Sequence, residues 1–492
     1  MALPSIISTN NRVPGMYVRV SLGVGVRSGL DATRRVIAFG NKTASGTGVA
    51  GTPYRIGSPD DAATLGGRGS EIHLAAIAAF AVHPSVELWV IIITEAGTAA
   101  TGTLVFAGTA TQAGTVRVYV RGDLIEVAIA VGDTAAVVAT AVEAAIDDQT
   151  DWPVTAGVVT STVTVTAKNL GVRGNRIALR AEIVDGSGIT VTPPAAGYLT
   201  GGATSDNPAT AITAAAGDEY YYYALPYDDA TNLDLFEASL DSLDEPEQGK
   251  RAVYIAGCID TPANAITLAT GRNFARGSIV WEEGSEDYPL VMAVSLAAHR
   301  ARNESTNPAA NMSGTAIPGL RPSPRAADVP TATELSNAIN NGLSPLRRTR
   351  DGSMLLVRNC TTRTLDSAAN PDYRVLDAHK VSVCDFLASD IETFLADRFT
   401  GFLLADDRED GEPPAPGVAT PLTVRDAFAS RLSTYDANNQ RAILPLLERV
   451  DELLESLVVE RASAPAGRLN AAITADVVDH LLQVATDVRQ VG

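Results

Sequence analysis

Hydrophobic and polar residues alternate near the start of the chain, which predicts a β-strand over residues 16–22. A Val-Pro-Gly turn signal precedes this segment, and three glycines separate it from the next predicted strand, 35–39. A terminal strand on a glycine-rich tether need not pair within its own chain, and we predict that residues 1–23 are an N-terminal arm. The arm residues expected to pair with a neighbouring subunit are Met16, Tyr17, Val18, Arg19, Val20 and Leu22.

After the arm, short apolar runs alternate with helical patterns. Ser58 and Ser70 are suited to cap helices over 59–65 and 71–82, since a serine hydroxyl satisfies free amides of the first turn. The continuous apolar run Leu88–Ile93 is typical of a buried central strand. We interpret residues 24–96 as the first part of an α/β core.

The composition changes at about residue 97, where Thr, Val, Ala and Gly become frequent and charges rare. A mainly β domain inserted over 97–202 is the simplest interpretation. Its expected elements are strands over 103–107, 116–120, 124–130, 158–167 and 176–183, with one helix over 134–147.

The α/β pattern resumes in the second part of the core, 203–345. A long loop rich in Asn, Ser, Pro and Gly is expected over 303–330, and Thr331 with Glu334 has capping-box spacing before a short helix. The expected strands cover 220–225, 252–256 and 277–281, and the expected helices cover 232–243, 263–273 and 289–301.

A C-terminal domain is predicted over 346–480. It begins with a strand at 354–358 and contains the longest helical pattern of the chain, whose apolar face includes Leu376, Leu387 and Phe399. An acidic loop follows at 406–416, and a second amphipathic helix is expected over 442–459. The last segment, 481–492, is interpreted as a C-terminal arm, although its periodicity does not distinguish helix from strand. Its expected pairing residues are Leu482, Val484 and Val488.

The predicted fold class is therefore an α/β core with an inserted mainly-β domain, an α+β C-terminal domain, and extended N- and C-terminal arms. Each part is long enough to bury its own core, given 492 residues of which 46% are hydrophobic. The net charge of −19 repels phosphate backbones, so nucleic acid is not an expected partner. Apolar runs are too short to span a bilayer, and no export signal is recognised at the N-terminus.

Candidate chemistry is sparse. The segment 46–51 matches GxGxxG, but the preceding strand is expected to end at Phe39 and Pro53 follows, so a loop is preferred over a dinucleotide site. His73 and His83 have no metal-ligand spacing, and the acidic run beginning at Asp406 lacks the terminal glutamate of a calcium loop. The three cysteines show no CxxC spacing. No metal and no cofactor are therefore expected.

Nucleophilic catalysis is not indicated either. No GxSxG motif is present, and Ser313-Gly314 belongs to a small-residue loop without protease signature. His299 is interpreted as a cation in the last turn of a helix, where it suits the helix dipole, and His379 as a packed residue. We therefore do not expect an enzyme.

Four motifs occur in order along nearly the whole chain. They are the opening Val13-Pro14-Gly15-Met16-Tyr17-Val18; Leu65-Gly66-Gly67-Arg68-Gly69-Ser70 with His83-Pro84; the segment 114–132 with Asp133-Thr134-Ala135 and Pro153-Val154-Thr155-Ala156; and Arg358-Asn359-Cys360-Thr361-Thr362. Together they resemble the contractile tail sheath family, specifically the Mu-like phage sheath subunits.

This resemblance implies a structural protein of the virion tail, assembled in the bacterial host cytoplasm. Sheath subunits form stacked hexameric rings around a tail tube, contact baseplate and tail terminator proteins, and contract to drive the tube through the host envelope. The arms of each subunit join a β-sheet with neighbouring copies. The family core is described as subtilisin-like in shape, but the triad residues are absent from this sequence.

Two alternatives remain open. The chain is equally compatible with the sheath of a tailocin or type VI-like injection device, because one subunit does not distinguish these from a phage. An α/β hydrolase is the other alternative, disfavoured by the missing nucleophile arrangement. The inserted β domain is expected to face outward, either as a solvated decoration or as a glycan-binding module.

Overall fold

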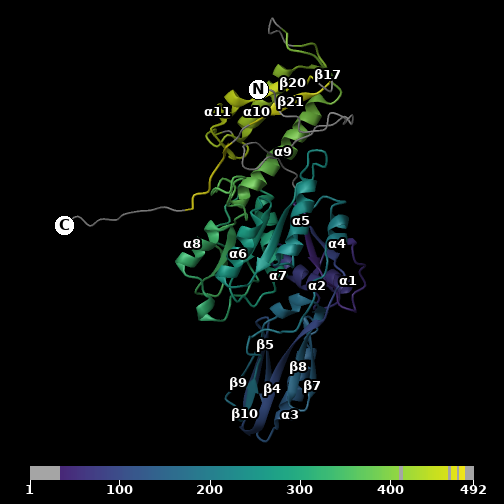
Figure 1. Ribbon diagram of the computed structural model, residues 1–492, viewed down its shortest axis with the longest axis vertical. Helices are drawn as coiled ribbons and strands as arrows, with labels where there is room; N and C mark the ends of the chain where they lie inside the picture. The colour runs from purple at the N-terminus through teal and green to yellow at the C-terminus, as the bar shows by residue number, and fades with distance from the viewer. Residues whose placement is uncertain (1–33, 409–413, 441, 464–466, 474–475, 483–492) are drawn as a thin grey trace, which may run out of the picture.

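The computed structural model describes residues 34–408, 414–440, 442–463, 467–473 and 476–482 of the chain. Figure 1 shows an elongated molecule with an α/β core in the middle, the inserted β segment at one end and the C-terminal part at the other. The predicted arm residues Met16, Tyr17, Val18, Arg19, Val20 and Leu22 lie outside the described residues, as do Val484 and Val488.

The core is built on a nine-stranded sheet in the order β14-β16-β15-β13-β12-β11-β1-β3-β2. The six strands from β15 to β3 are parallel, whereas β2 at one edge and the β16–β14 pair at the other are antiparallel. The strands are β1 (Val36–Gly40), β2 (Pro53–Ile56), β3 (Leu88–Ile92), β11 (Tyr222–Leu225), β12 (Val253–Cys258), β13 (Gly277–Trp281), β14 (Thr315–Ala316), β15 (Leu343–Arg348) and β16 (Met354–Leu356).

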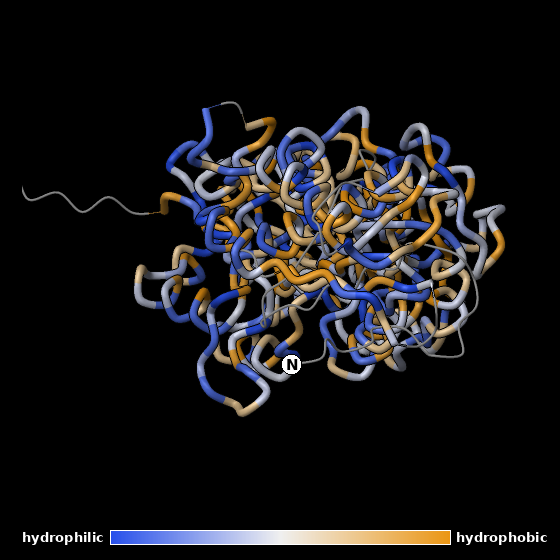
Figure 2. The backbone as a smooth tube through the Cα atoms, turned by 90° about the horizontal axis from the view of Figure 1, so that it is seen from above, coloured by the Kyte–Doolittle hydropathy of each residue, from blue (hydrophilic) through white to orange (hydrophobic). Residues whose placement is uncertain are grey.

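Both faces of the sheet are covered, so its central strands are continuously apolar rather than alternating. Val36 and Ala38 of β1 belong to one buried cluster, and Ile37 and Phe39 belong to the other. The first face packs on α1 (Pro59–Gly66), α2 (Glu71–Val82) and α7 (Pro289–Glu304), and the second on α4 (Ala209–Ala215), α5 (Ala230–Leu243), α6 (Pro262–Arg272) and α8 (Ala332–Asn340). Figure 2, seen along the long axis, shows hydrophobic segments running through the middle of the body.

The predicted helix starts of the core are confirmed. Ser58 accepts a hydrogen bond from the Asp61 amide, and Ser70 accepts one from the His73 amide. Thr331 and Glu334 form the expected capping box. These caps were predictable because each depends on residues only three positions apart.

The inserted segment contains two antiparallel sheets, β10-β4-β8-β7 and β6-β5-β9, with α3 (Ala135–Asp147) packed against both. Residues 158–167 do not form the single predicted strand. The chain reverses at Thr160, where φ is 56°, and makes a hairpin of β7 (Val154–Val159) and β8 (Thr162–Leu170). The other strands are β4 (Ala99–Gln112), β5 (Gly114–Val120), β6 (Asp123–Ile129), β9 (Leu179–Val184) and β10 (Ser187–Thr192), and a 3₁₀ turn covers Val172–Arg176.

The two ends of the inserted segment lie side by side. Thr98 pairs with Ala203, and Thr101 pairs with Thr200, in antiparallel bridges. The Thr101 amide donates to the Thr200 carbonyl at 2.8 Å, and the reverse bond is also 2.8 Å. The chain therefore leaves the core and returns to it at one point.

The C-terminal part has its own buried cluster around α9 (Ala378–Phe399), which confirms the long predicted helix. The helix predicted over 442–459 is wrong. Pro445 disfavours helical geometry at the preceding residue, and Arg449 adopts a left-handed conformation with φ of 46°. The segment is divided into β19 (Leu447–Glu448), α11 (Val450–Ser456) and β20 (Val458–Arg461); the remaining elements are β17 (Leu403–Leu404), β18 (Val418–Ala419), α10 (Pro421–Leu432), a 3₁₀ turn (Ser433–Tyr435), β21 (Leu469–Ala472) and β22 (Asp476–Val477).

The segment 358–362 fastens the start of the C-terminal part to the core. Thr361 donates from its amide to Leu376 and from its hydroxyl to Val375, both at 2.7 Å. The Thr362 hydroxyl donates to the Phe274 carbonyl and accepts from the Phe274 amide, both at 3.0 Å. Because Thr362 is fully buried, water cannot replace these partners.

We predict that Thr362→Val lowers the free energy of unfolding by about 1 to 3 kcal/mol, because valine keeps the shape but leaves the Phe274 amide without its partner and the Phe274 carbonyl with only the Gly277 amide at 3.3 Å. Thr270→Val, on the exposed face of α6, is the matched control and should change stability by less than about 0.5 kcal/mol. Urea unfolding followed by circular dichroism measures both. Equal effects of the two substitutions would contradict the role assigned to Thr362.

Candidate assembly surfaces and the joints of the subunit

His299 and Thr315 form the arrangement closest to a base–nucleophile pair among the described residues, with 2.9 Å between Nε2 and Oγ1. The Thr315 hydroxyl donates its proton to the Met312 carbonyl at 2.6 Å, so the histidine nitrogen must donate to Oγ1 and cannot accept a proton from it. Burial lowers the pKa of His299 to about 4. The interpretation of His299 as a last-turn cation is therefore wrong, since the residue is neutral at pH 7 and α7 continues to Glu304.

The glycine-rich segment 46–51 is a loop packed on the end of α1. The Gly48 amide donates to the Leu65 carbonyl at 2.9 Å, and a Cβ on Gly46 would lie 2.6 Å from the backbone of Gly66. No helix begins at this segment, and its small residues allow close backbone packing instead of phosphate binding. In the described part of the chain, no group of three or more His, Cys, Asp or Glu side chains has the arrangement of a metal site. None of the described helices is long and apolar enough to cross a membrane.

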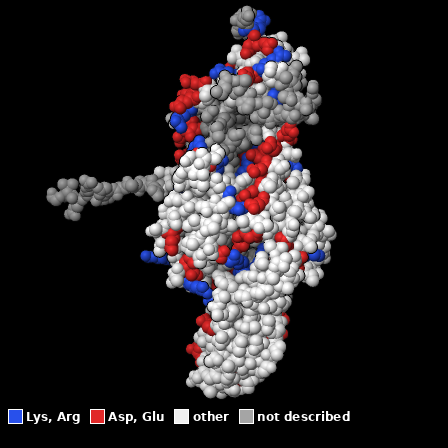
Figure 3. Space-filling view, in the orientation of Figure 1, with Lys and Arg blue, Asp and Glu red and all other residues white. Residues whose placement is uncertain are grey.

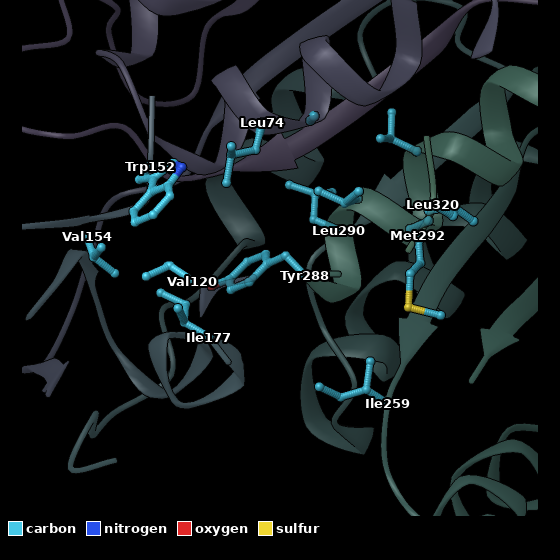
Figure 4. Close-up of a cluster of buried hydrophobic side chains, with 14 of the residues drawn as sticks. Leu74, Val120, Trp152, Val154, Ile177, Ile259, Tyr288, Leu290, Met292 and Leu320 are labelled. Atoms are coloured by element: carbon cyan, nitrogen blue, oxygen red, sulfur yellow. The ribbon is translucent and has the colours of Figure 1, made fainter. Parts of the chain in front are cut away.

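An apolar contact forms one side of the joint between the inserted segment and the core. Figure 4 shows Val120, Trp152 and Ile177 from the insert close to Leu74 and Tyr288 from the core. All five side chains are buried. The contact therefore behaves like domain core rather than like a wet surface.

Arg173 forms the ionic side of this joint. It donates to Glu71 of α2 from Nε at 2.8 Å and from Nη2 at 2.9 Å, and it also pairs with Asp206. The Tyr288 hydroxyl donates to Glu71 at 2.7 Å. Burial alone would lower the pKa of Arg173, but Glu71 and Asp206 outweigh it and keep the guanidinium charged. A cavity of about 200 Å³ borders this cluster and is lined by Arg173, Arg176, Asp228 and Tyr288.

Further ion pairs extend the joint along the carboxyl edge of the sheet. Arg176 of the insert lies 2.8 Å from Asp260, and Arg180 lies 2.5 Å from Glu286. Asp123 of the insert lies 2.7 Å from Arg321. The insert thus contributes cations at Arg176 and Arg180 and a carboxylate at Asp123, each paired with a core group of opposite charge, which fixes the orientation of the two parts.

Two carboxyl groups at the same edge are held in water-poor surroundings. Burial raises the pKa of Glu282 to about 7, with hydrogen bonds from Ser285 and from the Ser323 amide opposing this change. Burial raises the pKa of Asp287 to about 6, with Arg121 opposing it. Both groups therefore ionise at higher pH than ordinary carboxyl groups, Glu282 more so than Asp287.

The joint between the core and the C-terminal part is a buried ionic cluster. Glu304 accepts from Arg34 at 2.7 Å, from Arg300 at 2.9 Å and from the Tyr222 hydroxyl at 2.6 Å. Both arginines also reach Ser382 of α9. Burial would raise the pKa of Glu304, but the two guanidinium groups outweigh it and hold the pKa below its ordinary value.

A second cluster lies beside the first. Arg276 donates to Asp385 of α9 at 2.8 and 2.9 Å and to Asp244 at 2.7 Å. The Tyr221 hydroxyl also donates to Asp385 at 2.8 Å. Two core segments are therefore bonded to one carboxylate of the C-terminal helix.

The root of the predicted C-terminal arm is attached to three elements. Val478 donates to the Leu446 carbonyl at 3.1 Å, Asp479 lies 2.6 Å from Lys380, and His480 Nε2 lies 3.0 Å from the Ala309 carbonyl. The His480 ring stacks on His379 with 3.7 Å between centroids, and His379 is 2% exposed, which confirms that it is packed. This anchor was missed from the sequence because its contacts join residues about 100 and 170 positions apart.

Of the predicted arm residues, only Leu482 falls within the described part. Its side chain is 37% exposed, and the neighbouring Leu481 is 78% exposed. Two adjacent leucines thus face solvent directly after the anchored segment. The other predicted arm residues lie outside the described ranges, so their placement relative to Leu482 stays a prediction.

Comparison with known proteins gives a match along nearly the entire chain. The chain is 27% identical over 480 residues to the Mu-like prophage FluMu tail sheath protein of Haemophilus influenzae, covering 94% of this chain and 95% of that protein. No protein-family model matches.

Solved structures with a similar arrangement include the sheath tail protein of Desulfitobacterium hafniense, with 13% identity, a TM-score of 0.46, and coverage of 94% of this chain and 100% of that chain. The helical sheath of the anti-feeding prophage in its contracted state has 12% identity, a TM-score of 0.46, and coverage of 98% and 99%.

The match in sequence extends over both chains and agrees with the motifs described above. The chain is similar in sequence to the FluMu tail sheath protein over nearly the full length of both chains. Its similarity to the FluMu sheath protein confirms the resemblance to the Mu-like subunits in particular.

We predict that the free energy of unfolding falls as pH rises from about 5 to 8, because Glu282 has a higher pKa in the folded than in the unfolded chain. Such a group stabilises the fold fully below its unfolded pKa and loses this contribution as pH rises through the folded value near 7. Glu282→Gln should remove up to about 3 kcal/mol of this pH dependence.

Glu283→Gln is the matched control, since this neighbouring side chain is more exposed and should have a smaller effect. Guanidinium unfolding at pH 5, 6, 7 and 8 tests the difference. An unchanged pH dependence in Glu282→Gln would show that Glu282 is ionised without penalty.

Proposed function

We propose that this chain is the structural subunit of a contractile tail sheath, which polymerises as stacked hexameric rings around a tail tube and contracts to drive the tube through a host envelope. The observation that carries the proposal is the similarity to the FluMu tail sheath protein over 94% of this chain and 95% of that protein. The interlocked core supports it, because a force-transmitting subunit needs its parts held together by buried contacts.

The proposed partners are further copies of this chain, the tail tube, and the baseplate and tail terminator proteins. The proposed location is the virion tail, with assembly in the bacterial host cytoplasm. The sheath of a tailocin or type VI-like device would use the same subunit design and remains the alternative. We assign no catalytic role to the chain, in keeping with His299 donating to Thr315 rather than accepting a proton from it.

We further propose that the arms connect neighbouring subunits by adding strands to a sheet of the C-terminal part. The small sheet of β20 and β21 is suited to accept them, because it has two strands among the described residues and both outer edges are unpaired there. Unpaired edges offer a row of amides and carbonyls to another chain. The proposed donor residues are Met16–Leu22 and, at the other end, Leu482, Val484 and Val488.

Electron microscopy of the purified protein in negative stain is the direct test of the proposed function. Hollow helical tubes or stacked rings are the expected result at high protein concentration. Monomers that persist as the concentration rises, together with turnover of ester or peptide substrates, would favour the α/β hydrolase alternative instead.

Deletion of residues 1–23 should leave a folded subunit that does not polymerise, because the proposed donor strand is removed and the described core does not include it. Circular dichroism and a thermal melt check the fold, and sedimentation checks assembly. Sheaths of normal length from the truncated protein would contradict the arm assignment.

Val18→Pro should weaken assembly without unfolding the subunit, since proline lacks the amide that a ladder hydrogen bond requires. Val18→Ala is the matched control because it shortens the side chain and keeps the amide. The concentration needed for assembly is the measurement. Loss of folded monomer in the proline variant would instead place residue 18 in the core of its own subunit.

A further inference from the structure

One edge of the core carries arginines that lack acidic partners. Arg325, Arg347 and Arg350 form no ion pair with any residue that the structure describes, and Arg348 donates only to the Ser323 carbonyl at 3.4 Å. All four side chains are exposed. Elsewhere in the described chain arginines are mostly paired, as Arg34, Arg173 and Arg276 are. We call the set Arg325, Arg347, Arg348 and Arg350 the arginine hairpin.

Backbone geometry holds this set at the tip of the β15–β16 hairpin. Arg347 pairs in register with Leu355, and Arg348 pairs with Met354, so adjacent arginines point to opposite faces of the ladder. The hairpin is closed by Thr349, whose amide donates to the Ser353 carbonyl at 2.9 Å. The contact between Arg348 and Ser323 brings the loop of Arg325 to the same place.

Most acidic groups near the hairpin accept hydrogen bonds from neighbouring residues. Asp351 is bonded to Thr349 and Ser353 within the tip, and Asp328 accepts from the Ser323 hydroxyl at 2.6 Å. Glu282 is buried and bonded to the Ser323 amide, and Glu283 lies beside it at the edge of the core. Within residues 347–353 three arginines stand against one aspartate, so the tip itself carries a net positive charge, in a chain whose total is −19.

A complementary surface exists on the C-terminal part of the same chain. Glu448, Asp451, Glu452 and Glu455 lie within eight residues on and before α11, and all four are exposed. Arg449 is the one cation among them; it is bonded to Asp476 and lies 3.9 Å from Glu452, which leaves Glu448, Asp451 and Glu455 without a cation of their own among the described residues. The helix dipole accounts for Asp451 and Glu452 in the first turn, but it disfavours Glu455 near the end of the helix. Figure 3 shows acidic side chains on the upper part of the molecule, where Figure 1 labels α11.

We propose that the arginine hairpin of one copy binds the acidic surface of α11 on a second copy. This proposal rests on the proposed function, since it names one contact of the sheath lattice. Figure 1 places α11 in the upper part and α8, which directly precedes β15, in the middle of the molecule. The two surfaces are different, so the contact is heterologous, and each copy keeps one free hairpin or one free α11 for the next copy.

The charge of the whole chain favours this partner over nucleic acid. Arginine also binds phosphate well, but a net charge of −19 opposes the approach of a phosphate backbone over long range. Copies of the chain repel one another as well, and a local attraction between hairpin and α11 selects one relative orientation among them. The contact should weaken with salt because both surfaces are exposed.

The test uses the full-length protein and measures weight-average mass by analytical ultracentrifugation between 50 and 500 mM NaCl. The hairpin variant carries Arg347→Glu with Arg350→Glu, and the helix variant carries Glu452→Arg with Glu455→Arg. The swapped variant carries all four changes and restores the net charge. The control carries Arg55→Glu with Arg398→Glu, which makes the same change of charge as the hairpin variant at exposed sites elsewhere.

Wild type is expected to associate at low salt and to dissociate as salt rises. Each double variant should need roughly tenfold more protein to reach the same mass, and the swapped variant should return close to wild type. The control should differ little from wild type. Thermal melts verify that every variant is folded before it is compared.

Three results would overturn the proposal. A wild type that stays monomeric at every salt and protein concentration would show that the contact does not form. If the wild type and the variants with substitutions at these four positions associate equally, the hairpin does not bind α11. The proposed sheath function would not be contradicted, because other surfaces would then form the lattice. If the protein binds a fluorescent 30-nucleotide DNA through these arginines and does not self-associate, the partner of the arginine hairpin is nucleic acid and not a second copy of the chain.

Discussion

Glu304 and the two arginines on either side of it hold the subunit together. The carboxylate is fully buried, and it joins Arg34 at the entry to β1, Arg300 on the same helix and Tyr222 on the neighbouring strand. Through Ser382 the same arginines reach α9 of the C-terminal part. Loss of one member would leave an unpaired charge in the interior, which typically destabilises a protein by about 3 to 5 kcal/mol. Core and C-terminal part are thus bonded through groups that water cannot replace.

A second constraint acts at the other end of the core. There Arg173 crosses from the insert to Glu71 and Asp206, while Trp152 and Ile177 pack on the apolar side. Ligands usually bind at the carboxyl edge of a parallel sheet in folds of this kind. In this chain the same edge is occupied by ion pairs of the insert, so the position serves attachment.

Local signals in the sequence predicted much of the core and little of the joints. Serine and threonine caps, buried apolar runs and the long pattern of α9 depend on neighbouring residues, and each was found. The hairpin at Thr160 was missed because the turn, within Val158-Val159-Thr160-Ser161-Thr162-Val163, contains no Gly or Pro between residues that favour strands. The segment after Pro445 was misread because its apolar spacing suits a helix while Arg449 takes a left-handed conformation.

The candidate assembly residues also fall into those that local sequence indicates and those that only tertiary contacts reveal. The exposed Leu481 and Leu482 were recognisable as an unusual apolar end, whereas the stacking of His480 on His379 depends on tertiary contacts that sequence spacing does not reveal. His299 was interpreted as a cation in the last turn of a helix. Its burial against the loop of Thr315 instead removes its charge. What the sequence could not supply was the environment of each titratable group.

The bridges between Thr98 and Ala203 and between Thr101 and Thr200 also bear on how the chain folds. To the core, the hundred residues between them behave as one loop whose ends meet, and closing a long loop is only slightly less favourable than closing a short one. The nine-stranded sheet can therefore form around this crossing without waiting for the β sheets of the insert. Sequence and length within the insert are then free to change during evolution, provided that Arg173 and its neighbours still meet the core.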